Sequence, residues 1–229
     1  MMYLLLLIPF IKYARIFLNA SNTAILNTEN MANTLRLIEG IKLDSIVNCV
    51  ISMIITYFIL RNINTKNNYK NFIINAIFII YINELYSLVL YSHVSVFFNP
   101  ISSYPHILEG ATSLVPFKNI SEIFNSREDF LQVIGNALML SPLAFFAHYY
   151  GWSKSYIKTF IMLSCLSVFI ELFQLVQTFI YSMYTTEYIR VCDVDDVMLN
   201  SLSVIIGIVA FRIYENTKKL VMIDNIKNT

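Results

Sequence analysis

Three carboxylates lie close together in one polar segment of an otherwise apolar chain: Asp193, Asp195 and Asp196. Arg190 precedes them, and Asn200 follows them at the start of a long apolar run. Such a group could cap the N-terminus of the next helix, bind a divalent cation through oxygen ligands, pair with Arg190, or bind a cationic ligand. Capping requires one carboxylate only, so it leaves the other two for a different role.

Two stripes of polar residues flank this segment within apolar runs. The first has spacings of three and four residues, which put its members on one helical face; they are Ser164, Ser167, Glu171, Gln174 and Thr178. The second has the same spacing and contains Asp196, Asn200, Ser203 and Gly207. We expect the two faces to meet, with Asn136 adding an amide to the same seam. Ser, Asn and Gln often join membrane helices without any chemistry, whereas a buried Glu171 needs either a partner, such as Arg190, or a raised pKa.

The composition indicates which elements must position these residues. The chain has 229 residues, of which 57% are hydrophobic and 14% are charged. Soluble domains carry about 25% charged residues, so the composition predicts an integral membrane protein in contact with membrane lipids. A net charge of +1 excludes a nucleic-acid binder that relies on bulk basic charge. The three cysteines and three histidines are scattered, so we expect no zinc site, disulfide framework or cofactor.

The apolar runs predict an all-α, polytopic transmembrane helix bundle of five to six spans. Five runs are long enough to cross a bilayer: Leu43–Leu60, Phe72–Phe98, Leu131–Tyr150, Tyr156–Ile180 and Val197–Tyr214. Lys12 and Arg15 interrupt a sixth run, Met2–Leu18, which is either an uncleaved span or an interfacial helix. We expect an N-terminal region over 1–70, a four-helix membrane domain over 71–215 and a tail over 216–229.

The charges of the loops predict the orientation of the bundle in the cell membrane. The connections after Leu60 and Tyr150 are basic, as is the tail, whereas the connections 99–130 and 181–196 are rich in acids. Because cytoplasmic loops carry the excess of Lys and Arg, we expect the C-terminus to be cytoplasmic and the two acidic connections to face outward.

Four sequence pieces, in order, resemble the VanZ-like family of membrane proteins, named for a teicoplanin-resistance protein. They are the loop Leu114–Ile120 with Pro116 and Phe117, the segment Gly135–Phe145 with Asn136, the Glu171–Gln174 pair, and Arg190–Asn200 followed by Gly207. The resemblance covers about residues 72–214. The chain departs from the family pattern at packing positions only: Ala144, Cys192, Ser201 and Ser203. The resemblance implies that the functional residues are Asn136, Glu171, Gln174, Arg190, Asp193, Asp195, Asp196 and Asn200.

The resemblance implies a link to glycopeptide resistance. The first hypothesis is therefore a non-enzymatic membrane protein whose outward acidic site holds the antibiotic or a lipid-linked cell-wall precursor. The alternative is a membrane-embedded, metal-assisted hydrolase or transferase, with Glu171 as general base. The sequence offers no nucleophile–base pair and no basic cluster for a phosphate, which favours the first hypothesis. The oligomeric state stays open.

Overall fold

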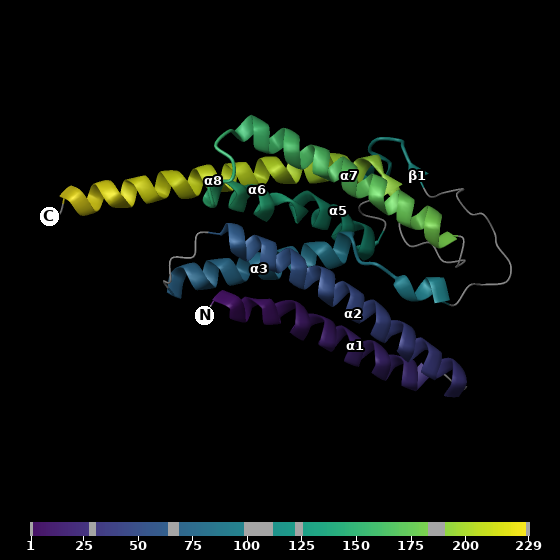
Figure 1. The fold of residues 1–229 in the computed structure, drawn as a ribbon. Helices are drawn as coiled ribbons and strands as arrows, with labels where there is room; N and C mark the ends of the chain where they lie inside the picture. Colours follow the sequence, from purple (N-terminus) through teal and green to yellow (C-terminus); the bar gives the residue numbers. More distant parts are fainter. Residues whose placement is uncertain are drawn as a thin grey trace. The chain divides into compact units, whose positions relative to one another are not determined.

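The computed structural model describes residues 2–27, 31–63, 69–98, 112–121, 126–182 and 191–227. Six candidate spans in this part of the chain are helical, long and apolar enough to cross a membrane (Figure 1). They are Tyr3–Asn22, Ile38–Asn62, Asn71–Phe97, Arg127–Tyr149, Tyr156–Ser182 and Val194–Ile223. The predicted helix bundle is confirmed, and the N-terminal run is one of the six candidate spans.

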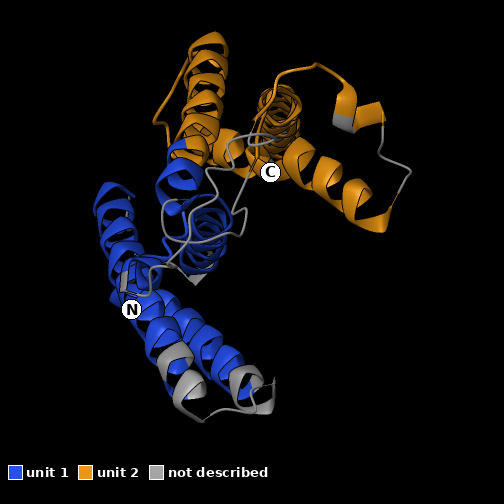
Figure 2. Ribbon diagram, turned by 90° about the vertical axis from the view of Figure 1, so that its right-hand side faces the viewer, with its two compact units in different colours: residues 1–111, 176–190 blue, residues 112–175, 191–229 orange. Residues whose placement is uncertain are grey.

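The chain divides into two compact units, coloured separately in Figure 2. The first, residues 1–111 and 176–190, contains η1 (Met2–Leu6), α1 (Leu7–Asn27), α2 (Met31–Asn62), α3 (Tyr69–Val89) and η2 (Val94–Phe98). The second, residues 112–175 and 191–229, contains β1 (Thr112–Ser113), α4 (Lys118–Ser121), α5 (Arg127–Met139), α6 (Ser141–Tyr149), most of α7 (Tyr156–Ser182), β2 (Cys192–Asp193) and α8 (Val194–Lys227). The sequence-based boundaries at 70 and 215 stay a prediction.

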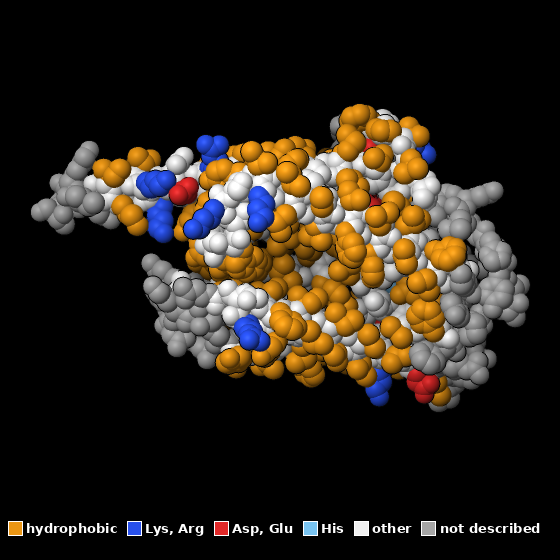
Figure 3. Space-filling view, turned by 45° about the horizontal axis from the view of Figure 1, so that its top comes forward, with side chains coloured by type: hydrophobic (Ala, Val, Ile, Leu, Met, Phe, Trp, Pro, Cys, Tyr) orange, Lys and Arg blue, Asp and Glu red, His pale blue; other side chains and the backbone are white. Residues whose placement is uncertain are grey.

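The outer surface of the helices is apolar, as lipid requires. On the face drawn in Figure 3, hydrophobic side chains cover most of the area between a few separated basic side chains. Along α7, large apolar residues with exposed fractions of 44–74% recur over the whole helix: Ile157, Ile161, Met162, Val168, Phe169, Leu172 and Val176. In water this exposure would favour aggregation, whereas in a bilayer it places hydrocarbon against hydrocarbon.

Unit 1 is held together by a polar stripe that the sequence analysis did not single out. Four residues of α2 recur every fourth position and are buried: Asp44, Asn48, Ser52 and Thr56. Asn83 of α3 joins two of them, since its amide nitrogen donates to Thr56 Oγ1 (3.1 Å) and its oxygen accepts from Ser52 Oγ. Asn48 Oδ1 accepts from the Tyr86 hydroxyl (2.8 Å). With no water in hydrocarbon, these bonds fix α2 against α3.

Lys12, which interrupts the N-terminal apolar run, lies in the middle of the Tyr3–Asn22 span and is satisfied by α3. Its ammonium lies 2.9 Å from Glu84 Oε2 and donates to Ser87 Oγ (2.6 Å) and to the backbone oxygen of Asn83 (2.8 Å). The Lys12 side chain is 13% exposed. A lysine with three oxygen partners is compatible with a span, because its charge is paired with a carboxylate and hydrogen-bonded.

The span predicted over Leu131–Tyr150 is interrupted in the middle, which the sequence analysis did not anticipate. The chain forms two helices, α5 and α6, which meet at Leu140. Pro142 lies in the first turn of α6, where it has no N–H to donate and its ring disfavours a continuous helix. Ser141 Oγ donates to the Leu138 carbonyl (2.9 Å), one of the groups released at the break.

The run predicted over Phe72–Phe98 also differs from one continuous helix. The α3 helix ends at Val89, and the chain continues through a short connection into the 3-10 helix η2. The Asp44 carboxylate accepts from Ser95 N and Ser95 Oγ, both at 2.7 Å. The α2 stripe therefore holds the 3-10 helix at the end of this segment.

Gly207 of α8 packs directly against the break between α5 and α6. A Cβ atom at this position would overlap the Ser141 carbonyl and lie 2.8 Å from the Ala144 Cβ. The predicted small-residue step of α8 therefore exists, but Gly207 faces the α5–α6 junction rather than α7. The close approach of the two backbones is possible only because the residue lacks a side chain.

We expect the Lys12→Met substitution to destabilise the protein by about 3 kcal/mol, because it leaves the Glu84 carboxylate without its cation inside the membrane. The double variant Lys12→Met/Glu84→Met removes both charges and should recover most of the loss. Reversible denaturation of the purified protein in mixed micelles measures both. A double variant no more stable than Lys12→Met would contradict the pairing.

We expect Gly207→Ala to lower the free energy of unfolding by about 1–3 kcal/mol, because the new Cβ would overlap backbone that has little freedom to move. Gly135→Ala in α5 is the matched control, since nothing lies within 4 Å of its Cβ position. Alanine should there be neutral or stabilising by up to about 1 kcal/mol. Thermal unfolding in detergent compares the two, and equal effects would disprove the close approach.

Candidate functional site

The loop Leu114–Ile120 is fastened to the acidic segment by backbone pairing. Strands β1 and β2 are parallel, with Thr112 opposite Cys192 and Ser113 opposite Asp193. Two residue pairs make a short ladder, so on its own it would hold the loop weakly. Further bonds are needed to fix the loop, and the acidic residues supply them.

Asp195 holds the loop with both of its carboxylate oxygens. Oδ1 accepts from the backbone N–H of Phe117 (2.5 Å), and Oδ2 accepts from the backbone N–H of Ile120 (3.2 Å). Its side chain is fully buried (0% exposed). Phe117 has a φ of 66°, a left-handed conformation that a bulky residue adopts only where its surroundings impose it. The two charge-assisted bonds from Asp195 supply that constraint.

Asp193 and Glu171 extend the same pattern into the helices. Asp193 directly precedes α8, and its Oδ1 accepts from the backbone N–H of Asp195 (2.8 Å), so it is the N-cap of α8. Glu171 of α7 is 4% exposed, and its Oε2 accepts from the backbone N–H of Asp193 (3.1 Å). These three carboxylates therefore each bind backbone amides, and together they join α7, the start of α8 and the loop.

Asp196 and Asn136 form a separate pair between α8 and α5. The Asn136 amide nitrogen donates to Asp196 Oδ1, and both residues are only partly buried. One turn deeper, Asn200 is fully buried, and neither of its amide atoms has a hydrogen-bond partner among the described residues. The Ser203 hydroxyl, also fully buried, is in the same situation. Unsatisfied buried polar groups of this kind cost about 1–3 kcal/mol each.

The structure thus brings together most of the residues singled out in the sequence. One group connects α7 and the start of α8 to the loop that contains Pro116 and Phe117; its members are Glu171, Asp193 and Asp195. A second group lies where α5 and α8 meet, and its members are Asn136, Asp196 and Asn200. Gln174 is buried (5% exposed) on the same face of α7 as Glu171. Arg190, the expected cation of the site, lies outside the described residues.

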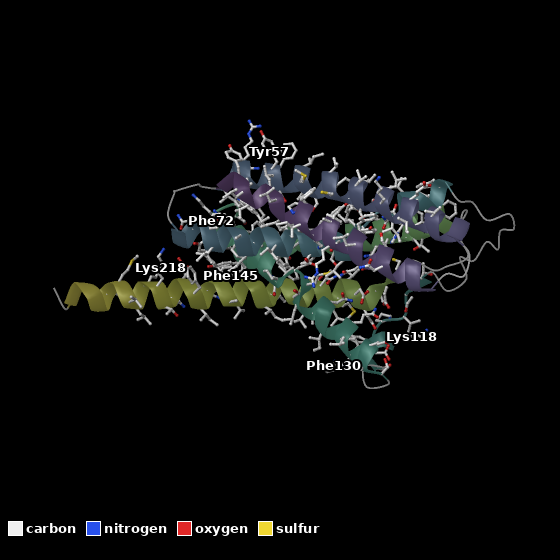
Figure 4. The ribbon with its side chains drawn as sticks, turned by 90° about the horizontal axis from the view of Figure 1, so that it is seen from below. Tyr57, Phe72, Lys118, Phe130, Phe145 and Lys218 are labelled. Atoms are coloured by element: carbon white, nitrogen blue, oxygen red, sulfur yellow. The ribbon has the colours of Figure 1, made fainter. Side chains whose placement is uncertain are left out.

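The tip of the loop is an exposed apolar surface, a property that the sequence analysis missed. Leu114, Val115 and Phe117 are exposed by 71%, 64% and 59%, and Pro116 between them is exposed too. Lys118 follows at the start of α4 and lies near the N-terminal end of α8 in Figure 4. The run of four apolar residues inside an acid-rich connection was the available signal. Asp195 holds this exposed apolar tip, and the next residue of α8, Asp196, bonds Asn136.

The described part of the chain has no group of three or more His, Cys, Asp or Glu side chains arranged to hold a metal ion. Burial raises the pKa of the Cys192 thiol, and the negative charges of Glu171, Asp193 and Asp196 raise it further. The carboxylates of the acidic segment therefore favour the protonated form of the Cys192 thiol.

Comparison with known proteins identifies a family. The family model described as VanZ/LLP1 matches residues 46–215. No curated protein and no solved structure matches the chain. The matched region includes all four sequence pieces on which the resemblance rests.

We expect Glu171→Gln to lower the pKa of the Cys192 thiol, because, after burial, the negative charge of Glu171 is the largest cause that raises it. A glutamine oxygen can still accept from Asp193 N–H, so the local structure should persist. The rate of alkylation by iodoacetamide between pH 7 and pH 10, in a variant with Cys49 and Cys165 replaced by Ser, reports the thiolate fraction. The profile should move to lower pH; an unchanged profile would show that the Glu171 charge does not reach Cys192.

Proposed function

The chain belongs to the VanZ/LLP1 family of membrane proteins, and from this membership we propose that it lowers the susceptibility of the cell to a glycopeptide antibiotic such as teicoplanin. In this proposal the protein acts by binding and not by catalysis. Its ligand is either the lipophilic antibiotic itself or a lipid-linked cell-wall precursor, and the site is the one built from the family motifs.

The observation that carries the proposal is that two consecutive residues of α8 hold an exposed apolar tip, Leu114–Phe117, and a polar pair. Asp195 fastens the tip, and the adjacent Asp196 bonds Asn136. A ligand with a lipid chain and a polar head needs both kinds of surface. Both ligands named above are amphiphiles of this kind, so the geometry fits either of them.

The buried carboxylates have a positioning role in this proposal. Glu171, Asp193 and Asp195 bind backbone amides and keep the tip in one conformation, so the binding surface is formed before the ligand arrives. Asn200 and Ser203 lie beneath Asp196 with polar atoms that have no partner in the described chain. A hydrogen-bonding group of the ligand that reached them would relieve the cost of burying them.

The orientation expected from the loop charges agrees with the proposal. With the C-terminus in the cytoplasm of a cell-membrane protein, the loop and the acidic segment face outward. Glycopeptides and lipid-linked precursors of the cell wall are encountered on that side.

We expect expression of the protein in a sensitive bacterial host to raise the inhibitory concentration of teicoplanin, and Asp195→Asn to abolish most of the increase. An asparagine offers one acceptor oxygen in place of two, so one of the bonds to Phe117 N and Ile120 N is lost and the tip is released. Phe117→Ser should have a comparable effect by removing apolar surface without altering the carboxylate.

Glu128→Gln is the matched control, because Glu128 is an exposed carboxylate in the first turn of α5, on another helix than Asp195. It should keep the susceptibility of the wild type. Membrane abundance of every variant is measured by immunoblotting, so that loss of protein is separated from loss of function. No change in susceptibility on expression of the wild type would refute the proposal.

A further inference from the structure

The turn between α6 and α7 is expected at the level of the lipid headgroups. It is the short connection 150–155, between a candidate span that ends at Tyr149 and one that begins at Tyr156. The rings of Tyr150 and Trp152 are in contact, with 5.2 Å between their centroids, and Trp152 is 43% exposed. Trp and Tyr are enriched where a chain passes from hydrocarbon to headgroups. Side chains of this turn are therefore within reach of the headgroups of one leaflet.

Basic side chains gather around this turn and around the part of α8 beside it. Residues 150–160 and 205–223 contain five Lys or Arg and a single acid, Glu215. The five are all exposed, and they are Lys154, Lys158, Arg212, Lys218 and Lys219. Figure 3 shows basic side chains gathered around the C-terminal half of α8. Among the described residues only Lys219 forms an ion pair, with Glu215 (3.2 Å), so the other four charges have no counter-ion within the described chain.

Arg212 is held at the start of α7 by an aromatic ring. Its guanidinium lies over the ring of Tyr156, 5.6 Å from the centroid. The same ring contacts that of His148 (4.8 Å), and His148 stacks on Phe211 (5.2 Å), so α6, α7 and α8 meet here. An Arg that rests on a ring loses less freedom when it binds an anion than a freely moving side chain does. Since Tyr156 is the first residue of α7, the guanidinium lies beside the beginning of that helix.

The beginning of α7 adds further groups that favour an anion. The Ser155 hydroxyl accepts from the Lys158 N–H (3.3 Å), while the first N–H groups of the helix have no acceptor within it. The helix dipole makes this end positive, and Lys154 directly precedes the cap. His148, which contacts the Tyr156 ring, is 8% exposed, and its Nε2 has no hydrogen-bond partner among the described residues. This nitrogen is available to a polar atom of a ligand.

The helix surfaces on the hydrocarbon side of these charges are apolar and exposed. Ile157 and Ile161 of α7 are exposed by 74% and 55%, and Val209 of α8 is exposed by 48%. Acyl chains pack against such surfaces. The region therefore combines unpaired positive charge at headgroup level with apolar surface at the depth of the acyl chains.

We propose that this region is a binding site for an anionic phospholipid. Lys154, Arg212 and the first turn of α7 bind the headgroup phosphate, and the acyl chains lie along the exposed apolar side chains of α7 and α8. Basic sites between membrane helices at headgroup level are a recurrent means of binding anionic lipids. Arg212 is 16 residues beyond Asp196 on α8, or about 24 Å along the helix. The site is therefore separate from the acidic segment, and the proposal does not rest on the proposed function.

The proposal is tested by thermal unfolding of the purified full-length protein in a non-ionic detergent. Phosphatidylglycerol or phosphatidylcholine with the same acyl chains is added, and the increase in Tm is measured from the Tm of the same variant without lipid. Because each variant is its own reference, a less stable fold is not mistaken for lost binding. We expect phosphatidylglycerol to raise the Tm by several degrees more than phosphatidylcholine. Lys154→Gln and Arg212→Gln should each remove most of this difference.

Lys218→Gln is the matched control, because it removes one exposed charge from α8 six residues beyond Arg212, on another side of the helix. It should keep the response of the wild type. Equal stabilisation by the two lipids would overturn the proposal, since the headgroup charge would then not be recognised. An equal loss in Lys218→Gln would overturn it too, because overall charge and not this site would decide. Inorganic phosphate that reproduced the full stabilisation would show a site for a free anion instead of a lipid.

Discussion

Hydrocarbon offers no hydrogen bonds, so the polar groups of this chain must be satisfied within the protein, and most of its architecture follows from this constraint. In unit 1 the amide and hydroxyl groups of α2 bond to α3, and Lys12 of α1 bonds to the same helix. In unit 2 the carboxylates bond to backbone N–H groups of a loop and of a helix start. Apolar packing alone could not select these arrangements, because lipid is as apolar as the helix surfaces.

The hydrogen bonds of the acidic segment show what each of its aspartates does. Three neighbouring aspartates at the mouth of a helix suggest a cation site, yet Asp193 and Asp195 are buried and engaged with backbone amides. Their hydrogen bonds reinforce the short β1–β2 ladder of two residue pairs, so that the loop is firmly attached to the start of α8. Asp196 is the only one of the three that is partly and not fully buried, and it accepts a hydrogen bond from Asn136. Neighbours in the sequence therefore perform different tasks, decided by the direction in which the start of the helix points each side chain.

The helical bundle could be predicted from the sequence because the length of an apolar run determines whether it crosses a membrane. The polar face of α7 could be predicted too, because a spacing of three and four residues admits one geometry. The break at Leu140 was in principle visible in Pro142, but proline is common in membrane helices and does not always divide them. The partner of Lys12 lies 72 positions away in the chain, and no local pattern identifies Glu84 as the residue it meets. The bonds from Asp195 to the loop could not be predicted either, because their donors are backbone N–H groups, which nearly every residue has.

The break between α5 and α6 has a consequence for how the protein is made. Neither helix is long enough to cross the bilayer on its own, and the backbone at their junction is covered by Gly207, which the ribosome adds much later. During synthesis the α5–α6 junction is therefore in the membrane before Gly207 can pack against it. Its final packing is therefore a late event of biogenesis, coupled to the insertion of the last helix. In a nascent chain that stops before α8, the fourth span is inserted, but the backbone at its break is not yet packed against another helix.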